Sequence, residues 1–383
     1  MRSSFLTLVL LVLFTLPSAH AERRNAAEKD QLVVHEWGTF TTLQDESGRD
    51  LSGINIDDEP VPGFVHNLSR FILQPSFLTD KHWVRRQKGA PPRHPRVTMR
   101  LETPVIYFHL PEGSPPVELD VGVDFRGGWL TEFYPNAKAS APGVDRGFLR
   151  KALTEDTLGQ LDWKCIRVGE KGKFPKTDEA VWTTPRKVDS DPVISAQGEA
   201  EQYIFYRGVA RRRSPLRVET SKDRSRLTVR GNFSEVACTE GTIVPAMWLV
   251  DVKEDGRVAF REVDAKRVTK DESLAIAEID AEFKESDYHK EHLVVLKKLM
   301  WIAIYRDGLY GDEATAMLDT WNRAYFESPG RRLFFVVPRE WTDHYLPLEI
   351  PKAQKVERVM IGRVELITQK QRRILREIAG AEV

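Results

Sequence analysis

The sequence predicts an α+β chain: a β-rich antiparallel body over residues 32–264, then a mainly helical segment and a short αβ tail over residues 265–383. Three observations lead to this prediction. Apolar and polar residues alternate in the first two thirds of the chain, many short strands are separated by Gly and Pro turns, and helical spacing begins near residue 269. Such a body is typical of a sandwich or an irregular barrel.

Residues 1–21 have the features of a secretory signal peptide. An apolar run over residues 5–16 is followed by Ala19 and Ala21, the small-residue spacing that a signal peptidase recognises. We expect cleavage after Ala21, a loose leader over residues 22–31, and a periplasmic or secreted protein. No later apolar stretch approaches the roughly 20 residues of a membrane-spanning helix, so we expect a soluble mature chain without a transmembrane segment.

The strands of the body are predicted from period-two alternation and turn signals. The clearest is residues 117–125, where every second residue is apolar and most of those between are acidic. Glu254-Asp255-Gly256 indicates a hairpin turn. The remaining strands are expected at residues 129–134, 203–209, 216–220, 226–230, 247–252 and 257–263.

The last third changes to helical spacing. A capping box at residues 269–272 introduces it, a long apolar helix is expected over residues 288–305, and a second helix is expected to begin with Asp312 as its N-cap. Strands at 333–337 and 356–366 and a final helix from 368 to 380 complete the tail. The tail strands could join the N-terminal sheet, so the boundary near residue 265 need not separate two domains.

The charge balance excludes one class of partner. The chain has 57 Lys and Arg against 57 Asp and Glu, whereas a nucleic-acid binder needs a net basic face. Two basic clusters indicate either solvated loops or a surface for an anionic glycan or envelope component: Arg85, Arg86, Lys88, Arg211, Arg212 and Arg213. Two cysteines, Cys165 and Cys238, indicate a disulfide in an oxidising compartment, or else two buried thiols.

The segment from His35 to Thr41 is the most distinctive local sequence. As a strand it places His35 and Trp37 on one face and Glu36 on the other, so His35 and Glu36 point apart. Either His35 is a metal ligand or proton carrier that faces a cleft, or it is a buried histidine with satisfied hydrogen bonds.

A metal site is one interpretation of the histidines in the first third. His35, His66 and His109 would be ligands of a divalent transition metal ion, and Glu36 or Glu132 would be the general base. None of these residues has a recognised ligand spacing, so folding alone would have to assemble the site. The acidic residues around 118–132 would instead serve a carboxylate-based hydrolase, or form a solvated acidic face.

The same heptapeptide, His-Glu-Trp-Gly-Thr-Phe-Thr, carries a resemblance. Together with residues 102–108, 308–310, 320–321 and 333–338, it resembles the sequence of a family of uncharacterised exported bacterial proteins, over nearly all of the mature chain. The resemblance implies a bacterial source and a single integrated unit. It implies no activity, cofactor or catalytic residue, and therefore assigns no roles here.

Two functions remain open at this point. The first is an exported binding or structural protein of the cell envelope or extracellular space, which needs no cofactor. It is favoured by the signal peptide, the β-rich body and the absence of Gly-x-Ser-x-Gly and Ser-x-x-Lys motifs. The second is a metal-assisted or carboxylate-based hydrolase that acts on an extracellular polymer such as a glycan.

Overall fold

The described residues form three β-sheets of nine, six and three strands. The computed structural model describes residues 30–53, 60–68, 96–140, 153–232, 241–264, 271, 273–367 and 371–373. The strands pair antiparallel apart from β1 and β18, which pair parallel. The prediction of a β-rich chain with antiparallel sheets is therefore confirmed.

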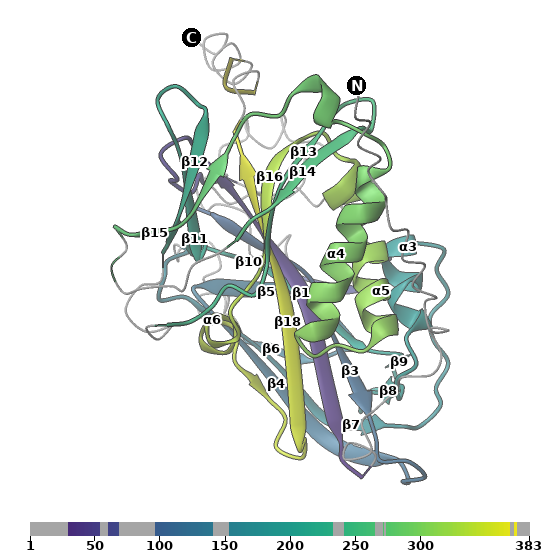
Figure 1. The fold of residues 1–383 in the computed structure, drawn as a ribbon. Helices are drawn as coiled ribbons and strands as arrows, with labels where there is room; N and C mark the ends of the chain where they lie inside the picture. The colour runs from purple at the N-terminus through teal and green to yellow at the C-terminus, as the bar shows by residue number, and fades with distance from the viewer. Residues whose placement is uncertain are drawn as a thin grey trace, which may run out of the picture.

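The nine-stranded sheet is the centre of the molecule, and its two longest strands run side by side through the middle of Figure 1. Its strands, in spatial order, are β14 (Val258–Glu262), β13 (Met247–Val252), β16 (Gly330–Val336), β18 (Lys355–Leu366), β1 (Val33–Gln44), β3 (Met99–His109), β10 (Ile204–Ala210), β5 (Gly128–Tyr134) and β2 (His66–Asn67).

Two smaller sheets complete the β-structure. The six-stranded sheet contains β17 (Leu348–Glu349), β4 (Val117–Arg126), β7 (Leu158–Val168), β8 (Val193–Ile194) and β9 (Ala200–Glu201), with β6 (Lys138–Ser140) paired to β7. The three-stranded sheet contains β11 (Leu216–Thr220), β12 (Arg226–Gly231) and β15 (Ala275–Asp280).

The helices gather mainly on one side of the nine-stranded sheet, where α4 and α5 lie side by side (Figure 1). The α-helices are α3 (Ala180–Thr183), α4 (His292–Arg306), α5 (Gly311–Thr320) and α6 (Arg339–Tyr345). Short 3-10 turns cover Pro185–Lys187 and Glu285–Asp287, and a π-helical turn covers Asn322–Glu327. No helix in the described ranges is long and apolar enough to cross a bilayer.

The nine-stranded sheet separates two apolar cores. One core lies against the smaller sheets and includes Val34 and Phe40 of β1. The other lies beneath α4 and α5 and includes Trp37 of β1. Strand β1 is consequently buried on both faces, which explains its run of β-branched and aromatic residues.

A glycine in the middle of β1 has a steric cause. A Cβ atom at Gly38 would lie 2.9 Å from Sδ of Met360 and 3.0 Å from Cα of Pro104. The β1–β3 register also shifts between Trp37 and Thr39. Met360 of β18 and Pro104 of β3 lie so close to position 38 of β1 that only glycine fits there without displacing a neighbour.

Most strand predictions agree with the structure, because alternation is a local signal. Strand β4 buries Leu119, Val121 and Val123 and leaves the residues between them partly exposed, as the alternation predicts. The helical spacing expected from residue 269 is wrong in its first part, because Ala275–Asp280 form strand β15. The helix expected from residue 288 begins later, at His292. Asp312 lies inside the first turn of α5, and Tyr310 occupies the N-cap position.

The two ends of the described chain meet in the nine-stranded sheet. Strand β1 pairs with β18 from Val33 opposite Lys355 to Gln44 opposite Leu366. Strand β16 pairs with the other edge of β18. Residues on both sides of position 265 therefore contribute neighbouring strands to one sheet.

Candidate metal centre at His35, His109 and Glu313

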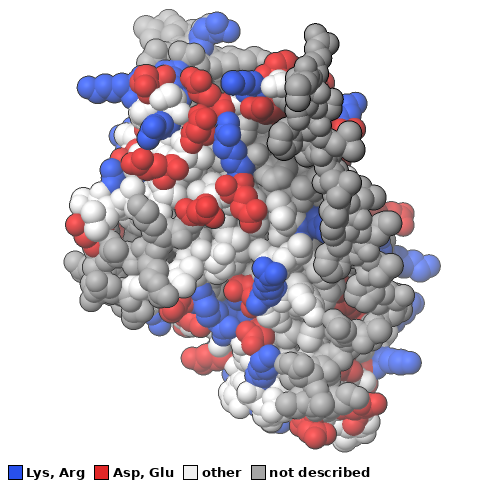
Figure 2. All heavy atoms as spheres, viewed as in Figure 1, with Lys and Arg blue, Asp and Glu red and all other residues white. Residues whose placement is uncertain are grey.

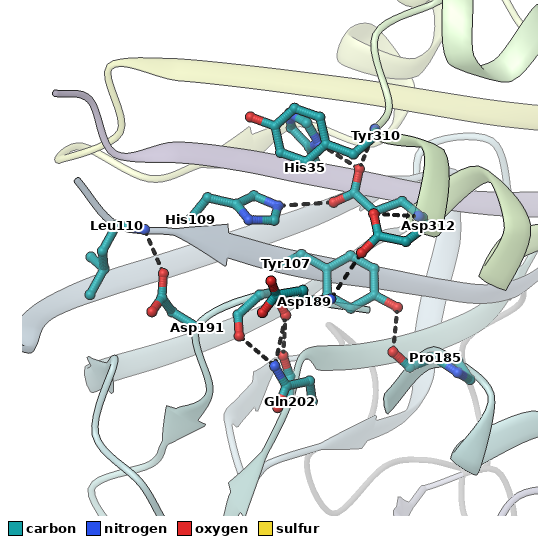
Figure 3. Close-up of polar contacts among 12 residues, drawn as sticks. His35, Tyr107, His109, Leu110, Pro185, Asp189, Asp191, Gln202, Tyr310 and Asp312 are labelled. Atoms are coloured by element: carbon teal, nitrogen blue, oxygen red, sulfur yellow. Dashed lines mark hydrogen bonds and ion pairs between the residues drawn. The ribbon is translucent and has the colours of Figure 1, made fainter. Parts of the chain in front are cut away.

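Three elements bring two histidines and one glutamate together between the sheet and the helices. His35 lies on β1, His109 ends β3, and Glu313 lies in the first turn of α5. In the antiparallel β1–β3 pair His35 lies opposite Tyr107, so His109 is its diagonal neighbour on the same face. Figure 3 shows His35, His109 and Tyr310 turned toward one another.

The carboxylate of Glu313 is the centre of this cluster. Nδ1 of His35 lies 2.6 Å from Oε2 of Glu313, and Nε2 of His109 lies 2.9 Å from Oε1. The backbone N–H of Tyr310 donates to Oε2 at 2.8 Å. One ligand atom from each of the three side chains lies within 4.8 Å of the other two, in the only such group of three or more residues in the described ranges.

The cluster is almost fully enclosed. His35 is 1% exposed, His109 3% and Glu313 0%. Burial raises the pKa of the Glu313 carboxyl, but the charge of His35 and the hydrogen bonds of both imidazoles outweigh it and lower that pKa to about 2. The group is thus an ionised carboxylate at neutral pH, and a buried carboxylate needs a compensating positive charge.

Tyr310 covers the two imidazoles. Its ring centroid lies 4.4 Å from that of His35 and 4.9 Å from that of His109. Nε2 of His35 is buried and has no hydrogen-bond partner among the described residues. A buried imidazole nitrogen without a hydrogen-bond partner costs free energy unless a ligand or an ion binds it.

The residues around the cluster hold its elements in register. The backbone N–H of Asp189 donates to Asp312 at 3.0 Å, and Tyr107 donates its hydroxyl hydrogen to the carbonyl of Pro185 at 3.0 Å (Figure 3). Complete burial raises the pKa of Tyr107 well above its usual range, so its hydroxyl stays protonated and remains a donor. These contacts join α5 to the segment after α3 and limit how far Glu313 can move.

Sequence reasoning missed Glu313, although its position contained a signal. Glu313 lies on the same helix face as Met317 and Thr320, and all three are buried. A charged residue on the apolar face of a helix needs a partner. The spacing of α5 therefore pointed to a buried carboxylate, but nothing local indicated that its partners would be His35 and His109.

The third predicted histidine lies elsewhere. His66, on the edge strand β2, contacts both carboxylate oxygens of Glu199, at 2.9 Å and 3.0 Å. Both side chains are about a third exposed. The set that the structure brings together is therefore His35, His109 and Glu313, not the three histidines expected from sequence.

Glu36 points away from the cluster, as the period-two alternation predicts. It accepts a hydrogen bond from the hydroxyl of Tyr206 and one of 2.6 Å from Nε of Arg358. Glu36 is 0% exposed. A carboxylate bound by a guanidinium on the far face of β1 is not available as a general base for the His35 cluster.

Glu132 is also engaged in an ion pair. It lies on β5, is buried, and contacts the side chains of Arg207 and Asn67. The acidic residues of β4 belong to the six-stranded sheet, whereas β5 belongs to the nine-stranded sheet. The prediction that these two strands share an acidic face is therefore wrong. Although they are neighbours in the sequence, β4 pairs with β7 and β5 pairs with β10.

Several sequence predictions lie partly or wholly outside the described residues. These are the signal peptide, the basic residues Arg85, Arg86 and Lys88, and Cys238. Cys165, on β7, is exposed and its thiol is free in the structure. The disulfide therefore stays a prediction.

Comparisons with known proteins add no function. No family model matches the chain, and no curated protein is similar to it. Among solved structures, the yeast delta-COP-I mu-homology domain complexed with a Dsl1 WxWxV peptide aligns with a TM-score of 0.25 and 10% sequence identity. The alignment covers 88% of this chain and 97% of that chain. A TM-score this low supports no conclusion about the fold or the activity.

Proposed function

We propose that the chain is an exported bacterial protein of the cell envelope that binds one divalent transition metal ion, zinc first, at His35, His109 and Glu313. The observation that carries the proposal is the donor set itself. Two imidazoles and an ionised carboxylate, each at most 3% exposed, converge from β1, β3 and α5. Imidazole and carboxylate are ordinary zinc ligands, and copper accepts imidazole equally well.

The geometry requires little movement to accept an ion. In a tetrahedral zinc site with bonds of about 2.0–2.2 Å, ligand atoms lie about 3.3–3.5 Å apart. The His35–Glu313 and His109–Glu313 contacts are 2.6 Å and 2.9 Å long. Each would lengthen by less than about 1 Å, while the ligand atoms that now lie up to 4.8 Å apart would approach by up to about 1.5 Å. The ion would take the place of the His35 charge as the positive partner of the buried Glu313 carboxylate.

Burial favours a structural role for the ion. Structural sites are closed, and this one joins a helix to two strands of the central sheet. A metal bound here would fix α5 over β1 and β3, and would so stabilise the body of an envelope binding protein. Export and envelope location are part of this proposal and are supported by the signal features of residues 1–21.

A metal-assisted hydrolase is the second candidate, and one observation favours it. Two histidines and one glutamate form a three-residue ligand set, which in catalytic zinc sites leaves a fourth position for water. Glu36 and Glu132 are engaged with Arg358 and Arg207, so neither would be its base. Turnover of an ester, peptide or glycan panel by the metal-loaded protein, lost in Glu313→Gln, would favour this candidate.

Metal content tests the proposed site. Protein exported through its own signal and purified without a His tag should contain about one zinc, copper or iron per chain by elemental mass spectrometry. His109→Gln and Glu313→Gln should contain less than a tenth of that, because each removes one of three ligands. His66→Gln is the matched control, since it removes a histidine paired with a glutamate outside the cluster.

A second readout protects the test against misfolded variants. Wild-type protein reconstituted with Co²⁺ should show the visible absorption bands of a four-coordinate site. Wild-type protein that stays free of metal after reconstitution and shows no such bands would overturn the proposed site.

A further inference from the structure

A second polar feature lies at the junction of several loops and strands. It is a hollow of about 350 Å³ with five arginines in its lining: Arg49, Arg211, Arg212, Arg213 and Arg217. We refer to it as the arginine hollow. Its volume is within the range of small-ligand sites in proteins.

Ordered backbone holds these arginines in place. Two hydrogen bonds fix the segment after β10 to Thr98, the residue before β3. The backbone N–H of Arg212 donates to Oγ1 of Thr98 at 2.9 Å, and the Thr98 hydroxyl donates to the carbonyl of Arg212 at 2.8 Å. The backbone N–H of Arg211 donates to Gly127 at 2.9 Å. These contacts fix the backbone of Arg211 and Arg212 at the edge of the hollow that all five arginines line.

Two of the side chains are held as well. The guanidinium of Arg212 lies 4.3 Å from the ring centroid of Tyr345 and donates to the carbonyl of Glu155 at 2.6 Å. Arg217 pairs with Glu219 at 3.0 Å, but Glu219 also pairs with Arg230 at 3.0 Å. One carboxylate shared between two guanidinium groups leaves the charge of Arg217 only partly compensated.

The remaining charge is compensated only in part: Arg49 pairs with Asp45 at 3.2 Å, and Arg213 interacts electrostatically with Asp50. Arg211 and Arg213 are exposed, and no ion pair from the described residues reaches either side chain. The lining contains five arginines against two acids, Asp50 and Glu155, which leaves three positive charges in excess. On the face drawn in Figure 2, by comparison, basic and acidic side chains are interspersed.

We propose that the arginine hollow binds a small ligand through a tetrahedral oxyanion group, the phosphate or sulfate of a substituted sugar. A cleft lined by one sign of charge concentrates ions of the other sign. The guanidinium fork donates two parallel hydrogen bonds to such a group, which a lysine cannot do. The hollow has room for a sugar beside the anion, and the inference is independent of the metal site.

Calorimetric titration of the mature protein at low salt tests the inference. The ligands are inorganic phosphate, glucose 6-phosphate, glucose 6-sulfate and glucose. We expect saturable binding of one oxyanion ligand per chain and no binding of glucose. The ratio of the two ester affinities distinguishes a phosphorylated from a sulfated ligand. Raising the salt concentration from 50 to 500 mM should weaken binding, because exposed charges are screened.

Substitution of Arg211 and Arg213, the two exposed arginines that form no ion pair with the described residues, localises the site. Arg211→Gln/Arg213→Gln should weaken ester binding at least tenfold, while the exposed Arg306→Gln on α4, outside the hollow, should leave it unchanged. Unaltered affinity in the double variant, or no saturable binding of any oxyanion to the wild type, would overturn the inference. If the double variant folds poorly, the single Arg213→Lys keeps the charge and should still weaken binding by removing the fork.

Discussion

The two faces of β1 bury carboxylates in opposite ways. On one face Glu36 contacts Arg358, a permanent cation, and the hydroxyl of Tyr206. On the other face, the hydrogen-bond partners of the Glu313 carboxylate among the described residues are the imidazoles of His35 and His109 and the backbone N–H of Tyr310. Both carboxylates are 0% exposed. The difference is therefore one of partner, not of burial.

The comparison separates a structural network from a candidate binding site. A guanidinium stays charged at all physiological pH values, so the Glu36 face is complete as it stands. Imidazole nitrogens bind protons or metal ions, so the Glu313 face can exchange its partner.

A third carboxylate, Asp50, lies near the end of β1 and accepts hydrogen bonds from the side chain of Gln44 and the backbone N–H of Ser214, both neutral donors.

The largest expected effect is on the Glu36 face. Arg358→Met should lower the free energy of unfolding by about 3–5 kcal/mol, because it leaves the carboxylate of Glu36 buried without its cation. Urea unfolding followed by circular dichroism measures this change. The double variant Glu36→Gln/Arg358→Met should recover most of the loss. A double variant as unstable as the single one would show that the packing of Arg358, not its charge, matters.

Metal removal should affect the Glu313 face alone. Zinc at a free concentration 100 times its Kd should raise the free energy of unfolding of the wild type by about 3 kcal/mol over chelator-treated protein. Glu313→Gln should show no difference between zinc and chelator. Arg358→Met should keep the zinc response, since its ion pair lies on the other face of β1. Superimposable wild-type curves in zinc and in chelator would contradict this prediction.

Asp50 should make stability depend on pH in the direction opposite to a carboxylate paired with a cation. Burial raises the pKa of Asp50 from 3.8 to about 6, although Gln44, Ser214 and Arg213 act against it and Asp45 adds to it. The folded state therefore binds the proton more tightly than the unfolded state. The contribution of Asp50 to stability is therefore largest below pH 4 and falls as the pH rises to 6. The expected loss is roughly 2 kcal/mol, from 1.4 kcal/mol per pKa unit reduced for partial exposure.

The measurement for Asp50 is how steeply the free energy of unfolding changes with pH, not its absolute value at one pH. In Asp50→Asn the decline between pH 4 and 6 should be smaller by that amount. The amide has one acceptor oxygen in place of two, so the variant is expected to be less stable than the wild type at neutral pH, where ionised Asp50 accepts from both Gln44 and Ser214. Equal slopes in the two proteins would show that Asp50 titrates normally.

The smallest effect is expected at His66. Its pairing with Glu199 is about a third exposed, and partly solvated ion pairs contribute little. His66→Gln should change the free energy of unfolding by less than about 1 kcal/mol and should leave the metal content unchanged. A loss as large as that of Arg358→Met would show that the edge strand β2 contributes more to stability than its exposure indicates.

Local patterns predicted many of the elements and one feature of the site. Alternation located β4, and the Asp255-Gly256 turn located the β13–β14 hairpin. The same period of two predicted that His35 and Glu36 point to opposite faces, as their contacts with Glu313 and Arg358 show. These features depend only on neighbours along the chain, and the sequence contains that information directly.

Long-range pairing could not be predicted in the same way. Nothing near His35 indicates that β18, more than 300 residues away, lies beside β1. Nothing near Glu132 indicates that β5 and β4 enter different sheets. Strand pairing depends on which apolar faces can be buried together, and many arrangements satisfy the same alternation.

By itself, the sequence determined the β-rich class and the opposite faces of β1 on which His35 and Glu36 lie. The tertiary structure alone decided that His35 and His109 are the partners of Glu313, that Arg358 neutralises Glu36, and that five arginines surround one hollow. The physical reason is that periodicity records whether a side chain is buried, whereas its contacts depend on how whole layers pack. A site built from three distant elements exists only once those layers meet.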